Sequence, residues 1–152
     1  MTIQRISLFV TLILSVTLLG CSGGVRVSGK VTYEDGSPLT VGTIIFDDGA
    51  ANFRAVMHND GSYALGVTKD AQKIPAGNYK VWFADTTTSE GNRAQRFTVY
   101  SRALADEYTS VGTTSLTANV AASGSQVFDF VVPPPKPKVT KEYVDGRLEV
   151  IE

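Results

Sequence analysis

The sequence predicts an all-β protein, and three observations lead to this class. After residue 24, apolar and polar residues alternate with a period of two in short runs, which is the pattern of half-buried strands. Clusters of turn-forming residues separate these runs about every eight to twelve residues. Beyond the N-terminal segment, no long run has the period of an amphipathic helix. We therefore expect a two-sheet antiparallel β-sandwich of about seven to eight strands.

The individual strands follow from the alternation and from the turns between the runs. Residues 78–85 show the clearest pattern, with Tyr79, Val81 and Phe83 on one face. Residues 59–61, Asn-Asp-Gly, predict a hairpin turn because these residue types tolerate a positive φ. The expected strands are residues 25–33, 39–46, 53–58, 63–67, 78–85, 96–100, 116–120 and 126–132.

Four segments of the chain do not fit this strand pattern. Residues 86–95 are rich in Thr, Ser and Gly and are expected to form an exposed loop, and residues 101–108 fit one helical turn or irregular structure. Residues 133–138 are mostly proline, which lacks the N–H that a ladder needs, and predict a semi-rigid spacer. Residues 139–152 hold an Asp-Gly turn between short alternating runs. This tail forms a hairpin docked on the domain, pairs with a partner or stays mobile, and the sequence leaves these alternatives open.

The N-terminal segment has the pattern of a secretory signal. Arg5 precedes residues 6–19, which carry no charge and would span only about 21 Å as a helix, short of a ~30 Å bilayer core. Residues 18–21, Leu-Leu-Gly-Cys, resemble the end of a bacterial lipoprotein signal. In that family the signal is cut before the Cys, which is acylated on its sulfur and on its new amine. The resemblance implies lipidation of Cys21, because two or more acyl chains hold a protein firmly on a membrane.

The same patterns imply an organisation and a location for the chain. We expect a lipoprotein signal peptide at 1–20, a lipid-anchored linker at 21–24, the β-sandwich domain at 25–132, the Pro-rich spacer at 133–138 and the tail or hairpin at 139–152. The acylated Cys21 makes the membrane a partner and places the protein in the bacterial cell envelope. Ser22 carries no charge of the kind that retains lipoproteins in the inner membrane, which favours the outer membrane, with the domain facing the periplasm or the exterior.

Composition excludes several classes of function. The chain has 152 residues and a formal net charge of −1, so it lacks the basic character of a nucleic-acid-binding domain. It holds one Cys and one His, which exclude a disulfide framework and a Cys/His zinc cluster. We expect no cofactor, no metal and no catalytic residue, since no nucleophile, base and third orienting group stand out.

Three further segments resemble one family of domains. Residues 27–39, Val-Ser-Gly-Lys-Val-Thr-Tyr-Glu-Asp-Gly-Ser-Pro-Leu, resemble the opening of bacterial carboxypeptidase regulatory-like domains. Residues 60–63, Asp-Gly-Ser-Tyr, and residues 74–81, Ile-Pro-Ala-Gly-Asn-Tyr-Lys-Val, are similar to the family's central turn and to a later strand. The resemblance covers roughly residues 25–132 and implies a transthyretin-like (prealbumin-like) β-sandwich. It also implies a non-catalytic accessory or binding module.

Four polar residues are candidates for catalysis or metal binding, and each of them also has a simpler structural interpretation. His58 ends a predicted strand just before a turn, where a lone His is more often a surface residue than a base or ligand. Asp47, Asp48 and Asp60 offer oxygen ligands to calcium, but they lie in turns without the spacing of a calcium loop. We therefore expect ordinary turn chemistry at these aspartates.

Two further hypotheses involve Trp82 and the first and last strands of the domain. Trp82 alternates with the core positions of its strand, so it faces outward unless both faces of the strand are covered. An exposed Trp stacks on sugar rings or anchors a partner, and Tyr79 and Tyr100 are aromatic residues that would extend such a site. Lys30 lies on the first predicted strand and Asp129 on the last, which suggests an isopeptide bond between them, but Lys30 shares its face with polar residues and is expected to be exposed.

The sequence thus favours a non-catalytic, lipid-anchored interaction or accessory module of the cell envelope. Such a sandwich presents its loops or an open sheet edge to an envelope protein or a surface polysaccharide. The alternative is a carbohydrate-binding module at the cell surface that uses Trp82. An enzyme is the least favoured reading, because the residues that catalysis would need are missing.

Overall fold

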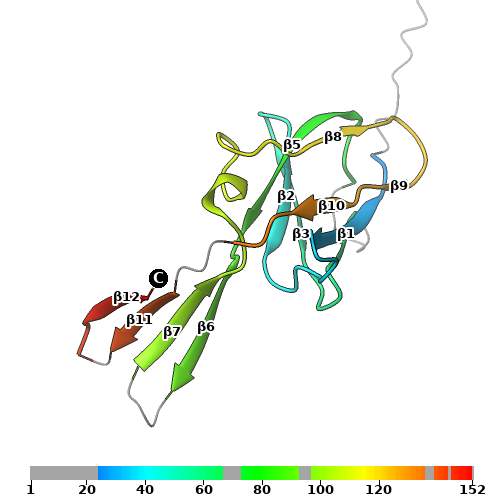
Figure 1. The fold of residues 1–152 in the computed structure, drawn as a ribbon. Helices are drawn as coiled ribbons and strands as arrows, with labels where there is room; N and C mark the ends of the chain where they lie inside the picture. The colour runs from blue at the N-terminus through cyan, green and yellow to red at the C-terminus, as the bar shows by residue number, and fades with distance from the viewer. Residues whose placement is uncertain (1–23, 67–72, 93–96, 136–138, 144, 152) are drawn as a thin grey trace, which may run out of the picture.

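The computed structural model describes residues 24–66, 73–92, 97–135, 139–143 and 145–151 (Figure 1). Within these residues the chain is built from strands and one short 3-10 helix. The strands are β1 (Val27–Tyr33), β2 (Thr43–Asp47), β3 (Asn52–Val56), β4 (Ser62–Leu65), β5 (Gly77–Ala84), β6 (Thr87–Asn92), β7 (Phe97–Arg102), β8 (Thr117–Val120), β9 (Gln126–Val127), β10 (Phe130–Val132), β11 (Val139–Tyr143) and β12 (Leu148–Ile151). The 3-10 helix, η1, spans Asp106–Tyr108. The prediction of an all-β class is confirmed.

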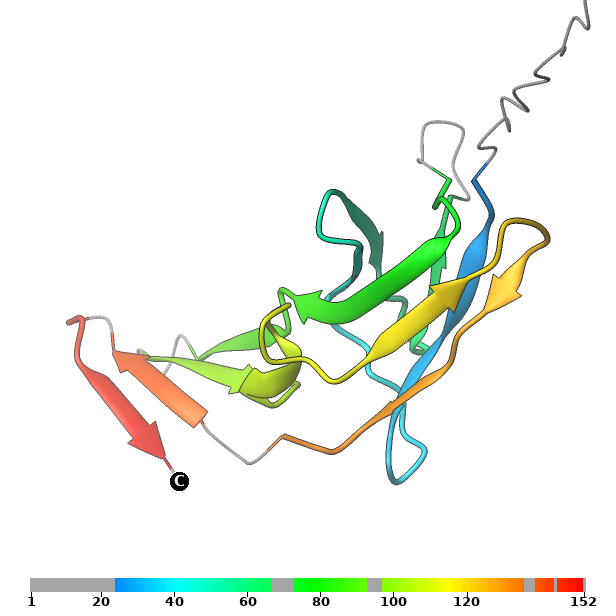
Figure 2. The same ribbon diagram turned by 90° about the horizontal axis from the view of Figure 1, so that it is seen from above.

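Two sheets enclose one core, as in a β-sandwich (Figure 2). One sheet has the order β3-β2-β5-β8 and is antiparallel throughout. The other has β1 at its centre, with β4 on one side and β9 and β10 on the other. Alternation places every second residue of each strand in the core, which is why β5 buries Tyr79, Val81 and Phe83 as the sequence predicted.

Aromatic rings join the two sheets across the core. Phe46 of β2 lies at their centre, with its ring centroid 6.0 Å from that of Tyr63 on β4 and 6.3 Å from that of Phe130 on β10. It also lies 6.2 Å from Tyr79 on β5. These tilted and edge-on arrangements are the ones that aromatic quadrupoles favour. The aromatic cluster therefore connects residues that are far apart in the sequence.

Strand β1 departs from the predicted antiparallel arrangement. It pairs with β4 in antiparallel fashion but runs parallel to both β9 and β10. The reason is the route of the chain, because β9 and β10 return from the opposite sheet after β8 and enter beside the beginning of β1. The parallel seam is interrupted at Phe128 and Asp129, where the backbone of Gly29 approaches the carbonyl oxygen of Phe128 very closely.

Side chains complete the ladder at this interruption. Asp129 accepts a hydrogen bond from the backbone N–H of Lys30 at 2.7 Å, in place of a strand partner. The hydroxyl of Tyr63 donates to the carbonyl oxygen of Phe128 at 2.7 Å, and burial raises the pKa of this hydroxyl. A side chain at Gly29 would collide with the same carbonyl, since a Cβ there would lie 1.8 Å from the oxygen. This seam therefore requires glycine because of the close approach.

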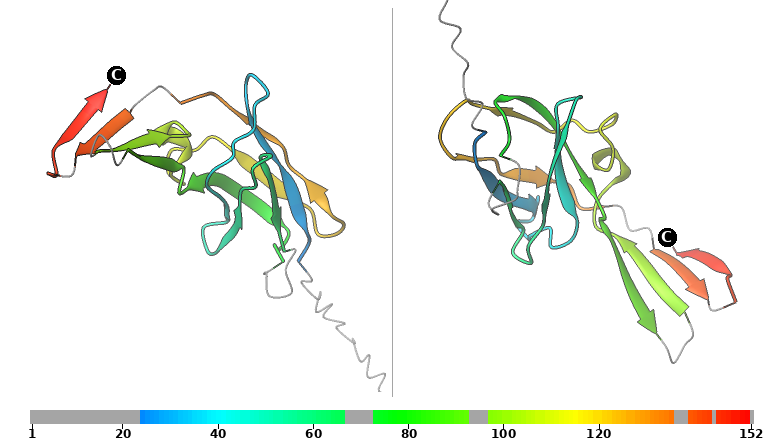
Figure 3. Two further views of the ribbon diagram at one scale, coloured as in Figure 1. Left: turned by 90° about the horizontal axis from the view of Figure 1, so that it is seen from below. Right: turned by 180° about the vertical axis from the view of Figure 1, so that it is seen from behind.

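A third sheet projects from the sandwich as an arm with the strand order β12-β11-β7-β6 (Figures 1 and 3). The expectation of a loop over residues 86–95 is wrong for Thr87–Asn92, which form β6 and pair with β7 along their whole length, although residues 87–91 are exposed as predicted. Residues 93–95 lie outside the described residues. Three consecutive threonines at 86–88 are β-branched and suit a strand, once a partner is present to pair with them. The tail does form a hairpin, and its β11 strand is paired with β7.

Two predicted turns are confirmed, whereas the number of strands differs from the prediction. The helical turn within residues 101–108 is confirmed by η1, although Ser101 and Arg102 belong to β7. The turn at 59–61 is confirmed, with a positive φ of 76° at Gly61. The described residues contain more strands than the predicted seven to eight, because β6, β11 and β12 of the arm are additional and the predicted strand 126–132 is divided into β9 and β10.

Residues 1–20, predicted to be a signal peptide, and Cys21 lie outside the described residues. Within the part of the chain that the structure describes, no helix is long and apolar enough to cross a membrane.

Replacing Gly29 by alanine should destabilise the sandwich by about 3 kcal/mol, at the upper end of overpacking costs, because the new methyl group meets a backbone oxygen that cannot move freely. Chemical denaturation of the purified protein measures this change. Gly91→Ala is the matched control, since nothing lies within 4 Å of a Cβ at that position in β6. Equal stability of the two variants would contradict the close approach at the seam.

Candidate functional site

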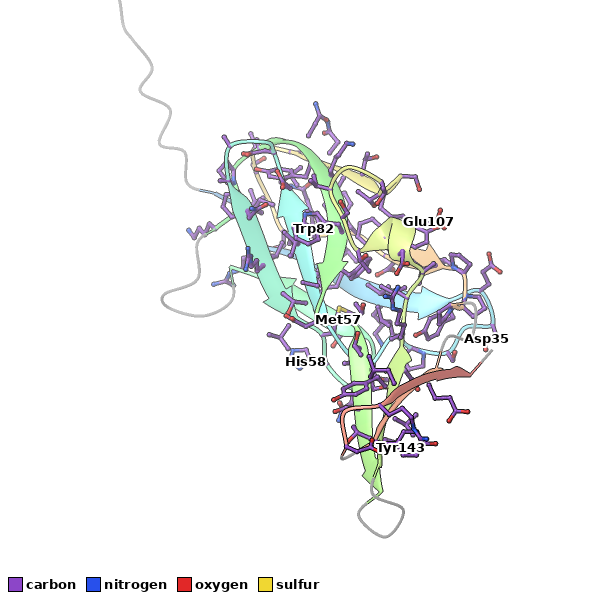
Figure 4. The ribbon with its side chains drawn as sticks, turned by 90° about the vertical axis from the view of Figure 1, so that its left-hand side faces the viewer. Asp35, Met57, His58, Trp82, Glu107 and Tyr143 are labelled. Carbon is purple, nitrogen blue, oxygen red and sulfur yellow. The ribbon has the colours of Figure 1, made fainter. Side chains whose placement is uncertain are left out.

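Trp82 lies on the outer face of the sandwich, on β5 (Figure 4). It is half-buried, and it is not among the residues of the central core. Its partner across the sheet is Ile45 of β2, which is 1% exposed although it too lies outside that core. Side chains directly opposite one another on a sheet are neighbours, so Trp82 and Ile45 form a small apolar layer on this face. The expectation that Trp82 points away from the core is confirmed, but the side chain is not fully exposed.

A pocket of about 540 Å³ lies where β5 runs on toward the arm. Its volume falls in the range typical of small-molecule sites. It is lined by consecutive residues from the end of β5 to the start of β6 and by residues between the end of β7 and the residue after η1. The lining residues are Trp82, Phe83, Ala84, Asp85, Thr86, Thr87, Arg102, Leu104, Asp106 and Thr109.

Charged side chains of both signs line this pocket. Arg102, the last residue of β7, forms an ion pair with Asp106 at the start of η1. Asp85 has a φ of 56°, the only positive value at a described residue other than glycine, and accepts a hydrogen bond from the Thr43 hydroxyl at 3.3 Å. Strained backbone of this kind is concentrated at functional sites. Sequence reasoning missed Asp85, Arg102 and Asp106, because no local pattern joins the end of β5 to the end of β7.

The indole N–H of Trp82 is an unusual feature of the pocket wall. It is buried, and no described residue accepts a hydrogen bond from it. A buried donor without a partner costs about 1–3 kcal/mol, so most native structures avoid one. The residues that line this pocket therefore include a tryptophan whose buried N–H has no acceptor among the described residues, an aspartate with a left-handed backbone and an ion pair.

The other two aromatic residues of the carbohydrate hypothesis do not join Trp82. Tyr79 is 2% exposed, and its hydroxyl donates to the carbonyl oxygen of Pro75 at 2.9 Å, which makes it a core residue. Tyr100 lies on β7 in the arm. Neither residue lines the pocket beside Trp82, so the expectation of a three-ring platform is wrong.

His58 takes part in the hairpin turn after β3 through its backbone. Its N–H donates to the carbonyl oxygen of Ser62 at 2.8 Å, and its own carbonyl accepts from Gly61 at 2.9 Å. The side chain is exposed (Figure 4). The structural interpretation, a surface residue beside a tight turn, accounts for its position.

The three turn aspartates use their carboxylates to hold the turns. Asp47 accepts from the Gly49 amide at 2.7 Å, and Asp48 accepts from the amides of Ala51 at 2.7 Å and Ala50 at 2.8 Å. Hydrogen bonds from Ala51 and then Ala50 lower the pKa of Asp48. Among the described residues, no group of three or more His, Cys, Asp or Glu side chains is arranged to hold a metal ion.

Asp60 has the same structural role in the hairpin before β4. It accepts from the hydroxyl of Ser62 at 2.6 Å and from its amide at 3.0 Å, and these bonds lower its pKa. The ammonium group of Lys30 lies 3.7 Å from the other oxygen of Asp60. Asp129 instead contacts the backbone of Lys30, so the structure does not bring the Lys30 ammonium and the Asp129 carboxylate together as an isopeptide bond would need.

The arm presents two open sheet edges, β6 and β12. The N–H of Tyr143 donates to the carbonyl oxygen of Arg147 at 2.9 Å, which makes these two residues a hydrogen-bonded pair. Antiparallel ladders alternate, so the backbone groups of Leu148 and Val150 point away from β11 and toward the open edge. Leu148 is 65% exposed. Among the described strands none pairs with this side of β12, so its edge presents main-chain groups beside an exposed apolar side chain.

Side-chain contacts stabilise the hairpin that carries this edge. The Tyr143 hydroxyl donates to Glu149 at 2.8 Å, which raises the pKa of Tyr143, and the Arg147 guanidinium lies 4.5 Å from the centre of the Tyr143 ring (Figure 4). Where the structure describes their exposure, the side chains of the arm strands are half-buried or exposed, and none is buried. The hairpin thus gains its order from cross-strand pairs and from β7, without the support of a core.

Comparison with known proteins places few constraints on this chain. No family model matches it, and no curated protein is similar to it. Among solved structures, the chain is similar to a DUF3823 family protein from Bacteroides ovatus, with 18% identity and a TM-score of 0.39. The similarity covers 77% of this chain and 55% of that protein, so the chain spans about half of that protein's length. The sheets of this structure establish its class, which is an all-β protein with the architecture of a β-sandwich.

Acid should destabilise the protein partly through Asp48. Its folded-state pKa is lowered below the ordinary value of 3.8, so its contribution to stability is present above about pH 5 and is lost as the pH falls through the folded-state pKa. Asp48→Asn keeps the accepting oxygen but cannot titrate, so thermal unfolding from pH 7 to pH 2 should show a smaller acid loss. Asp48→Ala, which removes the acceptor, should lower stability at pH 7 as well. An unchanged acid loss in Asp48→Asn would contradict this role.

Proposed function

We propose that this protein is a non-catalytic, lipid-anchored module of the bacterial cell envelope that binds a partner through the arm. The single observation that supports this function is the projecting sheet β12-β11-β7-β6, which has two open edges (Figure 3). A sheet normally packs one face against another layer, whereas here the described arm side chains are not buried. Unpaired strand edges accept an extended segment of another protein by main-chain hydrogen bonding.

The β12 edge suits such a partner better than the β6 edge. Each edge strand carries one glutamate, Glu90 in β6 and Glu149 in β12, but the rest of β6, Thr-Thr-Ser-Glu-Gly-Asn, is polar as well. Strand β12, Leu-Glu-Val-Ile, is mostly apolar and has high β-propensity. We infer that an envelope protein adds a strand to β12, which extends the arm without a change in the sandwich.

The same proposal includes the fold family of the sandwich and the lipid anchor at Cys21. The sequence resemblance to carboxypeptidase regulatory-like domains supports a transthyretin-like sandwich within residues 25–132, from which β6 and β7 extend into the arm. The resemblance to lipoprotein signals supports acylation of Cys21 and attachment to the outer membrane. In this arrangement the lipid holds the chain near residue 24, and the arm lies at the far end of the sandwich from that residue (Figures 2 and 3). The arm would then reach away from the membrane toward its partner.

A second candidate function is carbohydrate binding at the cell surface. The observation that favours it is the polar pocket beside Trp82, with its unpartnered indole N–H. The two functions use separate parts of the molecule, so they are compatible with one another.

Val150→Pro should weaken partner binding by about tenfold or more, because proline removes a donor at the open edge of β12 while leaving the hydrogen bonds to β11 in place. Val150→Thr is the matched control, since it keeps the N–H and the β-branched shape. Affinity capture from cross-linked cells, quantified by mass spectrometry, compares the two. Deleting residues 133–152 should also reduce capture of the partner. Undiminished capture by both the proline variant and the deletion variant would contradict binding at the β12 edge.

Cys21→Ser should abolish membrane attachment, because the anchor would lose its only acylation site. The chain has one Cys, so incorporation of labelled palmitate reports on this residue alone. Membrane fractionation of the labelled cells should find the native protein in the membrane and the variant in the soluble fraction. Label retained in the variant, or unchanged membrane attachment, would contradict lipidation at this position.

A further inference from the structure

The geometry points to a binding site for a neutral saccharide in the pocket lined by Trp82, Asp85, Arg102 and Asp106. This inference rests on the second candidate function and specifies its site and ligand class. It does not depend on pairing at the β12 edge. The pocket lies at the junction between the sandwich and the arm, since Asp85 follows β5 and Arg102 ends β7.

The residues that line the pocket favour a ligand that carries many hydroxyl groups. Carboxylates accept hydrogen bonds and a guanidinium donates them, whereas a sugar hydroxyl does both. Asp85 and Asp106 are therefore matched by hydroxyl donors, and Arg102 by hydroxyl acceptors. Thr87 and Thr109 add hydroxyls of their own to the lining. An apolar ligand would displace water from these charged and polar groups without replacing the hydrogen bonds that the water makes.

The charge balance argues for a neutral ligand. Two carboxylates face one guanidinium, so the pocket has a net charge of about −1 and repels anions such as uronic acids or phosphates. The ion pair between Arg102 and Asp106 already neutralises one of the two carboxylates, which lowers the attraction for a cation. Asp85 lines the same pocket outside this ion pair, and one of its two carboxylate oxygens accepts a hydrogen bond from the Thr43 hydroxyl at 3.3 Å.

Trp82 supplies the aromatic surface and a further donor. Sugar rings carry apolar C–H faces that pack on aromatic rings, and Trp82 is the only aromatic residue of the pocket wall that is not fully buried. Its indole N–H is buried and has no acceptor among the described residues, so a ligand hydroxyl would accept from it only if the ring moved on binding. The site thus combines the aromatic ring of Trp82, carboxylate and guanidinium groups, and an indole N–H that has no acceptor among the described residues.

The single tryptophan of the chain makes this site directly observable. The full lipidated protein, purified in a detergent without a sugar head group, is titrated with cello-, malto-, xylo- and chito-oligosaccharides while Trp82 fluorescence is recorded. We expect a saturable change with at least one of these neutral series. We expect no change with oligogalacturonate, which tests an anionic ligand, or with spermidine, which tests a cationic one.

Variants of the charged residues locate the binding. Asp85→Asn keeps a residue type that tolerates a positive φ, and Arg102→Gln keeps a polar side chain, so both should fold. Each should lower affinity by about tenfold or more, because each loses a charged hydrogen-bond partner of the sugar. Arg26→Gln and Asp35→Asn are the matched controls outside the pocket and should bind as the native protein does. Trp82→Phe, followed by calorimetry, removes the N–H and should also weaken binding.

The results that overturn the inference are distinct from those that overturn arm binding. Absence of a response to every neutral saccharide at about 10 mM, with an intact thermal transition, rejects the site. A response to spermidine alone, or equal affinities in the pocket variants and the controls, rejects the assigned ligand or its location. None of these outcomes alters capture through β12, which the Val150→Pro comparison tests separately.

Discussion

The close approach of Gly29 to the carbonyl oxygen of Phe128 is the constraint on which the rest of the structure depends. It lets the last strands of the sandwich lie parallel to β1 and close the core around Phe46. Tyr63 and Asp129 supply the hydrogen bonds that a regular ladder would have supplied there. Because the seam positions β10, it also sets where the proline-rich segment begins and hence where the tail hairpin meets β7.

The sandwich and the arm are stable for different reasons. The sandwich buries two rows of apolar side chains between its sheets, so its stability comes mainly from the removal of apolar surface from water. The arm depends on main-chain pairing and on cross-strand contacts such as those of Tyr143, which are individually small. An element of this kind opens at lower free energy than a core strand, and recognition elements are commonly drawn from such regions. The same feature that weakens the arm therefore makes it available to a partner.

Much of the sandwich could be predicted from the sequence, because period-two alternation and Asx-Gly turns are local signals. The inward face of β5 and the turn at Gly61 follow directly from them. The parallel seam could not be predicted, since it depends on which strands meet after a crossover between the sheets. The sequence of β6 predicts a loop, because a Thr- and Ser-rich segment forms a strand only when a partner such as β7 pairs with it. Trp82 was a candidate from its alternation, but Asp85 and Arg102 join it only in three dimensions.

Photo-cross-linking from the β12 edge inside the cell tests the central claim most directly. A photoreactive residue in place of the exposed Leu148 samples that edge, and the same residue in place of the exposed Thr117 on β8 samples the sandwich. The account predicts one dominant protein adduct from position 148 and a different or much weaker pattern from position 117. The same adducts in equal yield from both positions, or adducts from position 117 alone, would contradict binding through the arm.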